Sequence, residues 1–342
     1  MGNHKKNILY SIILISLIFL VYQFRKKDKI SFEEVHISGE TMGTVPYNVK
    51  YLHPEALSFD KEIDSLLKQF NQSLSTYIPS SEISEFNQGT SIRFRSPFFY
   101  PVLKASEQIY EATGGAFDPT IMPLVQAWGF GPQKAVSLDS AQIDSVLQYI
   151  GFHKISFDQD SLWKTNPNVQ LDFSAIAKGY AVDLIAQYLE SKAIHNFMVE
   201  VGGELVTKGH NIQKKTWLIG IKNPNYLEEG GKELTAKVQL DNRAMATSGN
   251  YLNYYIKDGK KYVHTIDPKS GYPLEQNLLS ATVFARDCMT ADAFATAFMV
   301  LGTEKSKELL NSREDLEGFL IYDEAGKLNV YHSKGLDSLL IP

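Results

Sequence analysis

The chain has 342 residues, 44% of them hydrophobic and 21% charged, which is the composition of an ordinary globular protein with one large domain or two joined ones. The chain has 34 lysine and arginine residues against 39 aspartate and glutamate residues, which gives a net charge of -5. This overall charge does not predict a nucleic-acid partner. The one cysteine, Cys288, excludes a disulfide within the chain and any cysteine-based metal cluster.

The amino end differs from the rest of the chain. Residues 7–24 are apolar and uncharged, and no small-x-small cleavage site follows them. Residues 1–24 are therefore predicted to be a membrane anchor or signal segment, and the absence of a cleavage site favours an uncleaved anchor. Residues 25–34 are predicted to be a polar linker before the folded body at 35–342. Basic residues are more numerous after the apolar run than before it, which by the positive-inside rule favours a cytoplasmic body.

The body mixes helices and strands without a regular β-α-β rhythm. Helices are predicted where apolar residues recur at helical spacing, at 59–75, 98–115, 137–151, 174–192 and 287–302. Strands are predicted where apolar and polar residues alternate between turn signals, at 35–52, 196–209, 215–224, 234–249, 254–268, 279–285 and 318–333, and a short strand is predicted at 169–171 before the helix at 174–192. This order predicts an α+β fold with mainly antiparallel sheets.

The predicted helix at 287–302 carries two polar side chains, Asp292 and Thr296, among Ala, Phe, Met and Leu. A spacing of four residues puts both on one helical face. A carboxylate and a hydroxyl oxygen suit Mg²⁺ that is held partly by a phosphate ligand. The alternative is a core helix in which Asp292 is satisfied by a backbone group and Thr296 bonds back to the carbonyl of residue 292.

The turn into the predicted helix at 174–192 has small residues after Asp172 and then Lys178 and Gly179. Small side chains at a helix start let backbone N–H groups approach an anion, and the lysine adds a charge. A capped helix with an exposed lysine explains the pattern as well. The glycine spacing of a Walker loop or a dinucleotide fingerprint is absent.

Two loops carry further candidates. Asp118 precedes a proline in GGAFDPT, where a turn starter is the alternative to a functional carboxylate. His264 and Asp267 lie three residues apart in a loop rich in Gly and Pro, and such a pair can do acid–base work or bind a ligand. Together with the oxygen ligands and the helix start, these residues predict a Mg²⁺-dependent reaction on a nucleotide-like pyrophosphate.

Eight segments in register resemble the ApbE family of FAD:protein FMN transferases. They are GETMGT (39–44), LSTY (74–77), GGAFDPTIMPLVQAWGFG (114–131), LDFSAIAKGYAVD (171–183), VEVGGEL (199–205), ATSGNY (246–251), HTIDPKSGYP (264–273) and MTADAFATAFMVLG (289–302). The resemblance spans nearly all of the chain after residue 35 and implies that 35–342 is one FAD-binding flavin transferase domain.

The resemblance also implies residue roles. The implied FAD contacts are Met42, Tyr77, Ala116, Phe117, Asp118, Asp172, Lys178, His264 and Thr265. The implied Mg²⁺ ligands are the carbonyl of Ala175 and the side chains of Asp292 and Thr296. Some relatives have an aspartate where this chain has Ala295, so a single Mg²⁺ is expected here.

The implied reaction moves FMN from FAD onto a Thr or Ser hydroxyl of an acceptor flavoprotein subunit and releases AMP. His264 is the expected base, with Asp267 orienting its loop. One alternative is an FAD pyrophosphatase that yields FMN and AMP, and another is a membrane-tethered flavin carrier without turnover. Family members with an amino-terminal export segment imply a body on the periplasmic face of the inner membrane, against the charge count around the anchor.

Overall fold

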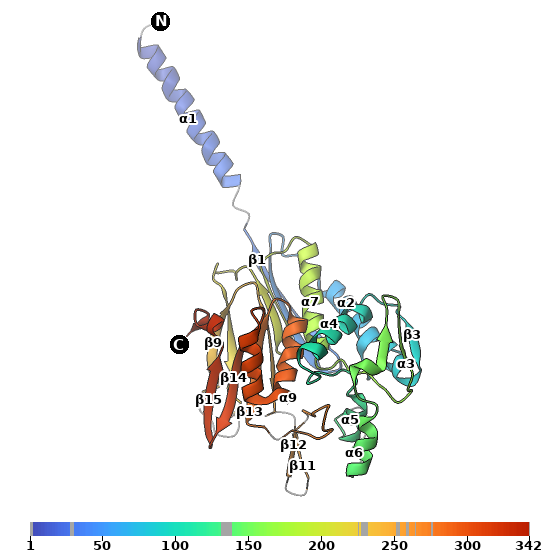
Figure 1. The fold of residues 1–342 in the computed structure, drawn as a ribbon. Coiled ribbons are helices and arrows are strands. Elements are labelled where there is room, and N and C mark those ends of the chain that lie inside the picture. The colour runs from blue at the N-terminus through green and yellow to red at the C-terminus, as the bar shows by residue number, and fades with distance from the viewer. Residues whose placement is uncertain are drawn as a thin grey trace.

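The structure is a computed structural model that describes residues 3–27, 31–130, 139–224, 226, 232–250, 254–257, 260–263, 265–274 and 276–341. It is an α+β fold, which confirms the prediction (Figure 1). A large antiparallel sheet runs through the body, with helices on one face and a small sheet on the other.

The large sheet has eight strands in the order β1-β2-β6-β7-β10-β13-β14-β15, and every neighbouring pair is antiparallel. Its strands are β1 (Glu33–Thr41), β2 (Val45–His53), β6 (Phe197–Val201), β7 (Glu204–Lys208), β10 (Ala244–Gly249), β13 (Leu278–Ala285), β14 (Glu317–Glu324) and β15 (Lys327–His332). Successive side chains of a strand point to opposite faces, so Ala244 and Ala246 join the core under the helices while Met245 joins the core under the small sheet.

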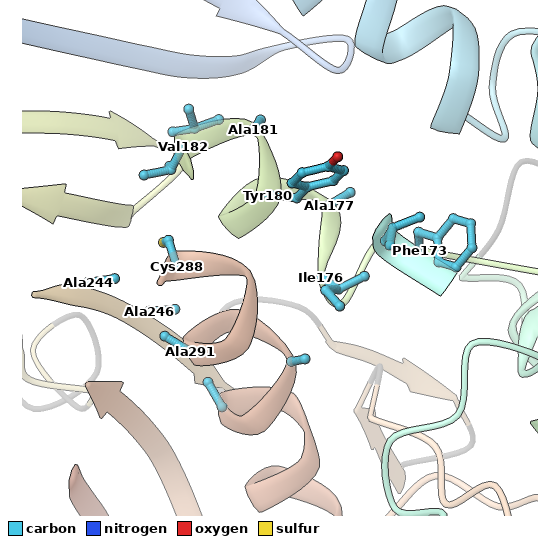
Figure 2. Close-up of a cluster of buried hydrophobic side chains, with 14 of the residues drawn as sticks. Phe173, Ile176, Ala177, Tyr180, Ala181, Val182, Ala244, Ala246, Cys288 and Ala291 are labelled. Atoms are coloured by element: carbon cyan, nitrogen blue, oxygen red, sulfur yellow. The ribbon is translucent and has the colours of Figure 1, made fainter. Parts of the chain in front are cut away.

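Two long helices, α7 (Ala177–Ser191) and α9 (Cys288–Ser312), lie side by side on the first face (Figure 1). Figure 2 shows Cys288 and Ala291 of α9 beside Ala244 and Ala246 of β10. These side chains are small and fully buried, which lets the helix lie close to the strand. α9 continues past the predicted end at residue 302 through a kink at Gly302, whose φ of 76° favours glycine.

The second face is covered by a three-stranded sheet. Its strands are β8 (Trp217–Lys222), β9 (Leu234–Leu240) and β16 (Leu340–Ile341). An apolar layer fills the space between the two sheets, with Leu240 from β9, Phe284 from β13 and Ile321 from β14. The strands β10, β13 and β14 are therefore apolar on both faces, whereas β1, which the small sheet does not cover, alternates between buried and exposed residues.

The remaining elements surround this core. The predicted helices at 59–75, 98–115 and 137–151 are confirmed as α2 (Asp60–Leu74), α4 (Phe99–Ala112) and α6 (Ser140–Leu147). The strand region at 254–268 holds a hairpin of β11 (Tyr254–Lys257) and β12 (Lys260–Val263). Elements that the sequence did not predict are α3 (Glu82–Gln88), α5 (Met122–Ala127), two 3-10 turns at Phe152–Lys154 and Lys334–Leu336, β16, and a small sheet of β3 (Ser91–Arg93), β4 (Ile155–Phe157) and β5 (Ser161–Lys164). The strand predicted at 169–171 is wrong, since this segment has only an isolated bridge between Gln170 and Ile121.

The amino-terminal segment forms helix α1 (Asn3–Lys27). Its apolar side chains between Ile8 and Phe19 are exposed. In the part of the chain that the structure describes, no helix is both long and apolar enough to cross a membrane. β1 begins at Glu33, so the first strand starts inside the predicted linker. The anchor, the linker and the catalytic domain stay predictions.

Candidate active site

A cavity of about 700 Å³ opens where the large sheet meets α7 and α9 on one side and β8 of the small sheet on the other. That volume lies within the range of small-molecule sites. Its walls combine segments that are far apart in the sequence: the loop at 116–121, the turn into α7, the β6–β7 turn, the end of β10, and the middle of α9. The fold therefore brings most of the candidate segments to one place.

Most of the predicted site residues line this cavity. They are Ala116, Phe117, Asp118, Asp172, Ala175, Lys178, Thr265 and Thr296. Asp292 lies directly behind this wall, with a side chain that is 2% exposed and bonded to Lys178. The predicted FAD side and the predicted metal side are thus two walls of one cavity.

Three other predicted residues lie outside the cavity lining. Tyr77 is 69% exposed, and Met42 lies in the turn between β1 and β2; neither is among the lining residues. Asp267 also does not line the cavity, and both its carboxylate oxygens accept backbone N–H groups of its own loop, from Lys269 and from Ser270. His264 lies outside the described residues. The roles assigned to these four residues stay predictions.

Asp118 is buried at the cavity wall. One carboxylate oxygen accepts hydrogen bonds from the backbone N–H of Thr120 over 2.8 Å and from its hydroxyl over 2.6 Å. Burial raises the pKa of Asp118 to about 6, although both bonds from Thr120 oppose the rise. The turn that the sequence indicated therefore exists, and its carboxylate also faces the cavity.

The turn into α7 offers fewer backbone donors than the sequence indicated. The N–H groups of Ile176 and Ala177 both donate to the carbonyl of Phe173, and that of Gly179 donates to Asp292. The Ser174 N–H donates to Asp172 over 2.8 Å. Three of the five amides at 174–178 therefore have partners inside the protein, and the expectation that this helix start holds an anion through its backbone stays a prediction. The ammonium of Lys178 adds a positive charge that can bind the same anion.

Lys178 bridges two buried carboxylates on different elements. Its Nζ lies 3.1 Å from Oε1 of Glu204 on β7 and 3.4 Å from Oδ1 of Asp292 on α9. Burial lowers the pKa of Lys178, but the charges of Asp292 and Glu204 outweigh burial and hold that pKa above its usual value. The lysine is therefore a fixed positive charge at the cavity wall.

Thr296 has a partner that the sequence did not indicate. Its hydroxyl shares a hydrogen bond of 3.1 Å with the hydroxyl of Ser248 at the end of β10. Asp292, by contrast, does accept from a backbone group, since Oδ2 takes the Gly179 N–H over 2.9 Å. The core-helix alternative is therefore confirmed for Asp292, whose carboxylate accepts a backbone N–H, although it also binds Lys178. It is wrong for Thr296, whose hydroxyl bonds to Ser248.

The match to known proteins covers the same segments. Residues 42–320 match the model of the ApbE family. The chain belongs to the ApbE family. This confirms the resemblance that the sequence motifs carried.

Individual members of the ApbE family match over most of their length. A protein from Haemophilus influenzae named FAD:protein FMN transferase is 37% identical over 330 residues, covering 92% of this chain and 93% of its own. One of the same name from Vibrio cholerae is 38% identical over 293 residues, covering 82% and 86%.

Solved ApbE structures share the fold. The flavin transferase ApbE from Vibrio cholerae has a TM-score of 0.81 at 35% identity, covering 90% of this chain and 99% of its own. The apo form of Pseudomonas stutzeri flavinyl transferase ApbE has a TM-score of 0.81 at 32% identity, covering 91% and 98%.

Two site residues were missed within the ApbE motifs. Glu204 follows the Gly-Gly turn in VEVGGEL, and a carboxylate placed directly after a tight turn was a signal that could have found it. Glu200, in the same motif, lines the cavity, where Asn48 and the Gly203 N–H both donate to its carboxylate. The two glutamates make this wall more acidic than the sequence motifs implied.

The part of the site formed by Asp292, Thr296 and the Ala175 carbonyl is called the metal edge, and the charges around it show whether it fits Mg²⁺. When both are ionised, Glu204 and Asp292 carry two negative charges against the single charge of Lys178, and Oε2 of Glu204 is buried without a hydrogen-bond partner in the described part of the chain. Burial, helped by the charge of Asp292, raises the pKa of Glu204 to about 8. A divalent cation would offset this excess negative charge, so the residues fit Mg²⁺.

The protein ligands alone are few. Among the described residues, no group of three or more His, Cys, Asp or Glu side chains could hold a metal ion. Asp292, Thr296 and the Ala175 carbonyl would offer one carboxylate, one hydroxyl and one carbonyl. Ala295 is fully buried and adds no ligand. Such a set suits an ion that takes its other ligands from a bound phosphate and water.

Proposed function

We propose that this chain is an FAD:protein FMN transferase that moves FMN from FAD onto a Thr or Ser hydroxyl of an acceptor flavoprotein subunit. The observation that carries the proposal is the single cavity whose walls hold Lys178 between two buried carboxylates and the loop of Phe117 and Asp118. The curated relatives that match over most of this chain bear the name of that activity.

The reaction forms one bond and breaks one. The acceptor hydroxyl oxygen attacks the phosphorus on the FMN side of the FAD pyrophosphate, and the bond from that phosphorus to the bridging oxygen breaks. AMP leaves with the bridging oxygen, and the hydroxyl proton passes to a base. The acceptor ends as a phosphoester of FMN, so no oxidant or reductant is needed.

The chain's own groups bind and orient the reactants. The Lys178 ammonium, held by Glu204 and Asp292, pairs with pyrophosphate oxygens. The Thr265 hydroxyl donates to Asn250 over 2.7 Å, which fixes the residue next to His264. We assign the base to His264 as part of this proposal, and Asp267 shapes its loop through the bonds from Lys269 and Ser270.

We further propose that Asp292, Thr296 and the carbonyl of Ala175 hold Mg²⁺ at this edge. When bound, the ion supplies electrostatic stabilisation of the pyrophosphate and of the departing AMP phosphate. Support comes from the excess negative charge and the unpartnered Oε2 of Glu204.

The test is incubation of the protein with FAD, Mg²⁺ and a candidate acceptor, followed by intact mass of the acceptor. Transfer predicts a gain of one FMN less one water, together with free AMP. Free FMN and AMP with an unchanged acceptor would favour the pyrophosphatase instead. FAD that survives with every acceptor tried would favour a carrier.

A matched variant tests the metal edge in the same assay. Asp292→Asn keeps the size of the side chain but removes its charge, and we expect transfer to fall by about 100-fold or more. Near wild-type transfer by this variant would refute the metal assignment. Circular dichroism of the variant checks that it is folded.

We also propose that the amino-terminal segment 1–24 anchors the protein at the inner membrane with the body on the periplasmic side. The support is the uncharged run at 7–24 and the exposed apolar side chains between Ile8 and Phe19. Carboxyl-terminal fusions to a reporter active only in the periplasm and to one active only in the cytoplasm decide the orientation. Activity of the cytoplasmic reporter alone would refute the periplasmic assignment.

A further inference from the structure

Each of the two helices on the large sheet has an aspartate that accepts backbone N–H groups from the start of the other helix. Asp183 of α7 accepts the backbone N–H groups of Cys288 and Met289, the first two residues of α9, both over 2.8 Å. Asp292 of α9 accepts the N–H of Gly179, the third residue of α7, over 2.9 Å. The first N–H groups of a helix have no partner within that helix, so each helix satisfies donors of the other.

The spacing along both helices makes the exchange possible. Gly179 and Asp183 are four residues apart on α7, and Cys288 and Asp292 are four apart on α9, so each pair lies on one helical face. A Cβ on Gly179 would lie only 2.1 Å from the Cys288 carbonyl oxygen, which shows how closely the two backbones approach. Figure 2 shows Cys288 at the first turn of α9 near this part of α7.

The start of α9 already has a cap of its own. Asp287, its N-cap residue, accepts the N–H of Thr290 over 2.8 Å. The carboxylate of Asp183 comes from another helix, is 8% exposed, and takes two different N–H groups. Asp183 therefore connects α9 to α7. This differs from the cap by Asp287, which satisfies an N–H group within α9 alone.

These bonds between the starts of α7 and α9 form a helix junction, and the groups that it aligns belong to the metal edge. Lys178 and Ala175 precede Gly179 at the turn into α7, while Asp292 and Thr296 are one and two turns beyond Cys288 on α9. A shift of α9 along α7 would change the separation of the groups from the two helices. The bonds of Asp183 oppose such a shift at one end of the contact, and the bond from Gly179 to Asp292 opposes it at the other.

We propose that Asp183 is a positioning residue for FMN transfer: it fixes the start of α9 on α7 and thereby sets the distance between Asp292 and Thr296 on one side and Lys178 and Ala175 on the other. This inference rests on the proposed function for its consequence in transfer. The helix contact itself can be measured separately.

The chain contains its own probe of this contact. Cys288 is the one cysteine in the sequence, and it is fully buried at the start of α9, where its backbone N–H donates to Asp183 of α7 and its thiol lies 3.8 Å from the Met245 carbonyl oxygen of β10. A thiol reagent reacts with it only when the start of α9 moves away from these neighbours. Its rate of labelling, measured without flavin or Mg²⁺, reports the helix junction independently of transfer.

The test compares Asp183→Asn with Asp287→Asn. The first puts an amide NH₂ against a backbone N–H that needs an acceptor, whereas the second keeps an oxygen for Thr290. We expect Asp183→Asn to label at Cys288 about tenfold faster or more than wild type, and Asp287→Asn to stay close to wild type.

The consequence at the metal edge is measured by titrating Mg²⁺ into the FAD-loaded protein and following flavin fluorescence. We expect the Mg²⁺ dissociation constant of Asp183→Asn to rise by about tenfold or more, as for other groups that orient metal ligands, with that of Asp287→Asn unchanged. A merely structural role for Asp183 would lower the thermal midpoint without this selective change.

Wild-type labelling and Mg²⁺ affinity in Asp183→Asn would overturn the proposal, and so would equal effects of the two variants. Should Asp183→Asn not fold, Asp183→Glu keeps the charge and lengthens the side chain by one methylene. It is then expected to label faster and to bind Mg²⁺ more weakly, and wild-type values for both would overturn the proposal. A wild-type protein that labels slowly but transfers no FMN would refute the proposed function and not the junction.

Discussion

Gly179 donates its backbone N–H to Oδ2 of Asp292, and only a residue without a side chain allows this bond. A Cβ at position 179 would lie 2.8 Å from Cβ of Asp292 and 2.1 Å from the Cys288 carbonyl oxygen. The orientation of the Asp292 carboxylate is therefore set by the close packing of two helix backbones, before any cation binds.

Gly179→Ala is expected to separate the two helices. The contact at 2.1 Å is to backbone, which has little freedom to move, so we expect a loss of about 1–3 kcal/mol in the free energy of unfolding, as for other overpacked sites. Urea denaturation measures this loss. The control is Gln187→Ala, an exposed position on the same helix, which should change the free energy by about 0.5 kcal/mol or less. Equal stability of the two variants would show that the backbones have room to part.

Glu204→Gln tests whether the charge beside Lys178 matters for the cation. The substitution removes one of the two ionisable carboxylates around the ammonium and leaves Asp292 as its one ionic partner there. Since Lys178 and the cation then compete for Asp292, we expect the Mg²⁺ concentration for half-maximal transfer to rise about tenfold.

The matched control for that charge is Glu200→Gln. Glu200 also lines the cavity, but the donors to its carboxylate are Asn48 and the Gly203 N–H, whereas Lys178 pairs with Glu204 and Asp292. Its neutral variant should keep the Mg²⁺ requirement within about threefold of wild type. The same shift in both variants would mean that the overall cavity charge, and not the contact with Lys178, sets the requirement.

Thr296→Val removes the hydroxyl assigned to Mg²⁺ while keeping the branched shape. Because its Oγ1 is bonded to Ser248 over 3.1 Å, Ser248→Ala removes the partner and leaves the proposed ligand in place. We expect the valine variant to need about tenfold more Mg²⁺ for half-maximal transfer and the alanine variant to need an unchanged amount. If Ser248→Ala alone raises the Mg²⁺ requirement, the serine is the ligand and the assignment to Thr296 is wrong.

Much of the fold follows from local patterns. Alternation and helical spacing predicted the strands β1, β2 and β6 to β15 and the helices α2, α4, α6, α7 and α9, because each element has an apolar face or core of its own. Short elements such as α3 and β3 were missed, since they hold their conformation through contacts distant in the sequence. The Glu82 carboxylate, for example, accepts the backbone N–H of Arg95.

The sequence predicted those parts of the site that a single residue or its spacing reveals. It did not predict the parts that depend on a contact between two elements. The spacing of Asp292 and Thr296 and the position of Lys178 were visible in the sequence. The pairing of Lys178 with Glu204, and of Asp183 with the start of α9, joins residues on different elements and appears only when the chain is folded.

Asp118 gives a stability prediction that depends on pH. Burial raises its pKa in the folded protein to about 6 from an ordinary value of 3.8. Between these two values the folded state holds a proton that the unfolded state has lost, so the stability contributed by this group is full below about pH 4 and is lost as pH rises through about 6.

An asparagine side chain does not titrate, which makes Asp118→Asn the reference. We expect the free energy of unfolding of wild type, relative to the variant, to fall by about 3 kcal/mol or less over this window and then stay level. Urea denaturation of the flavin-free proteins from about pH 4 to about pH 8 measures the difference. A wild type that gains stability over the variant as pH rises would mean that the bonds from Thr120 outweigh burial and hold the pKa below its ordinary value.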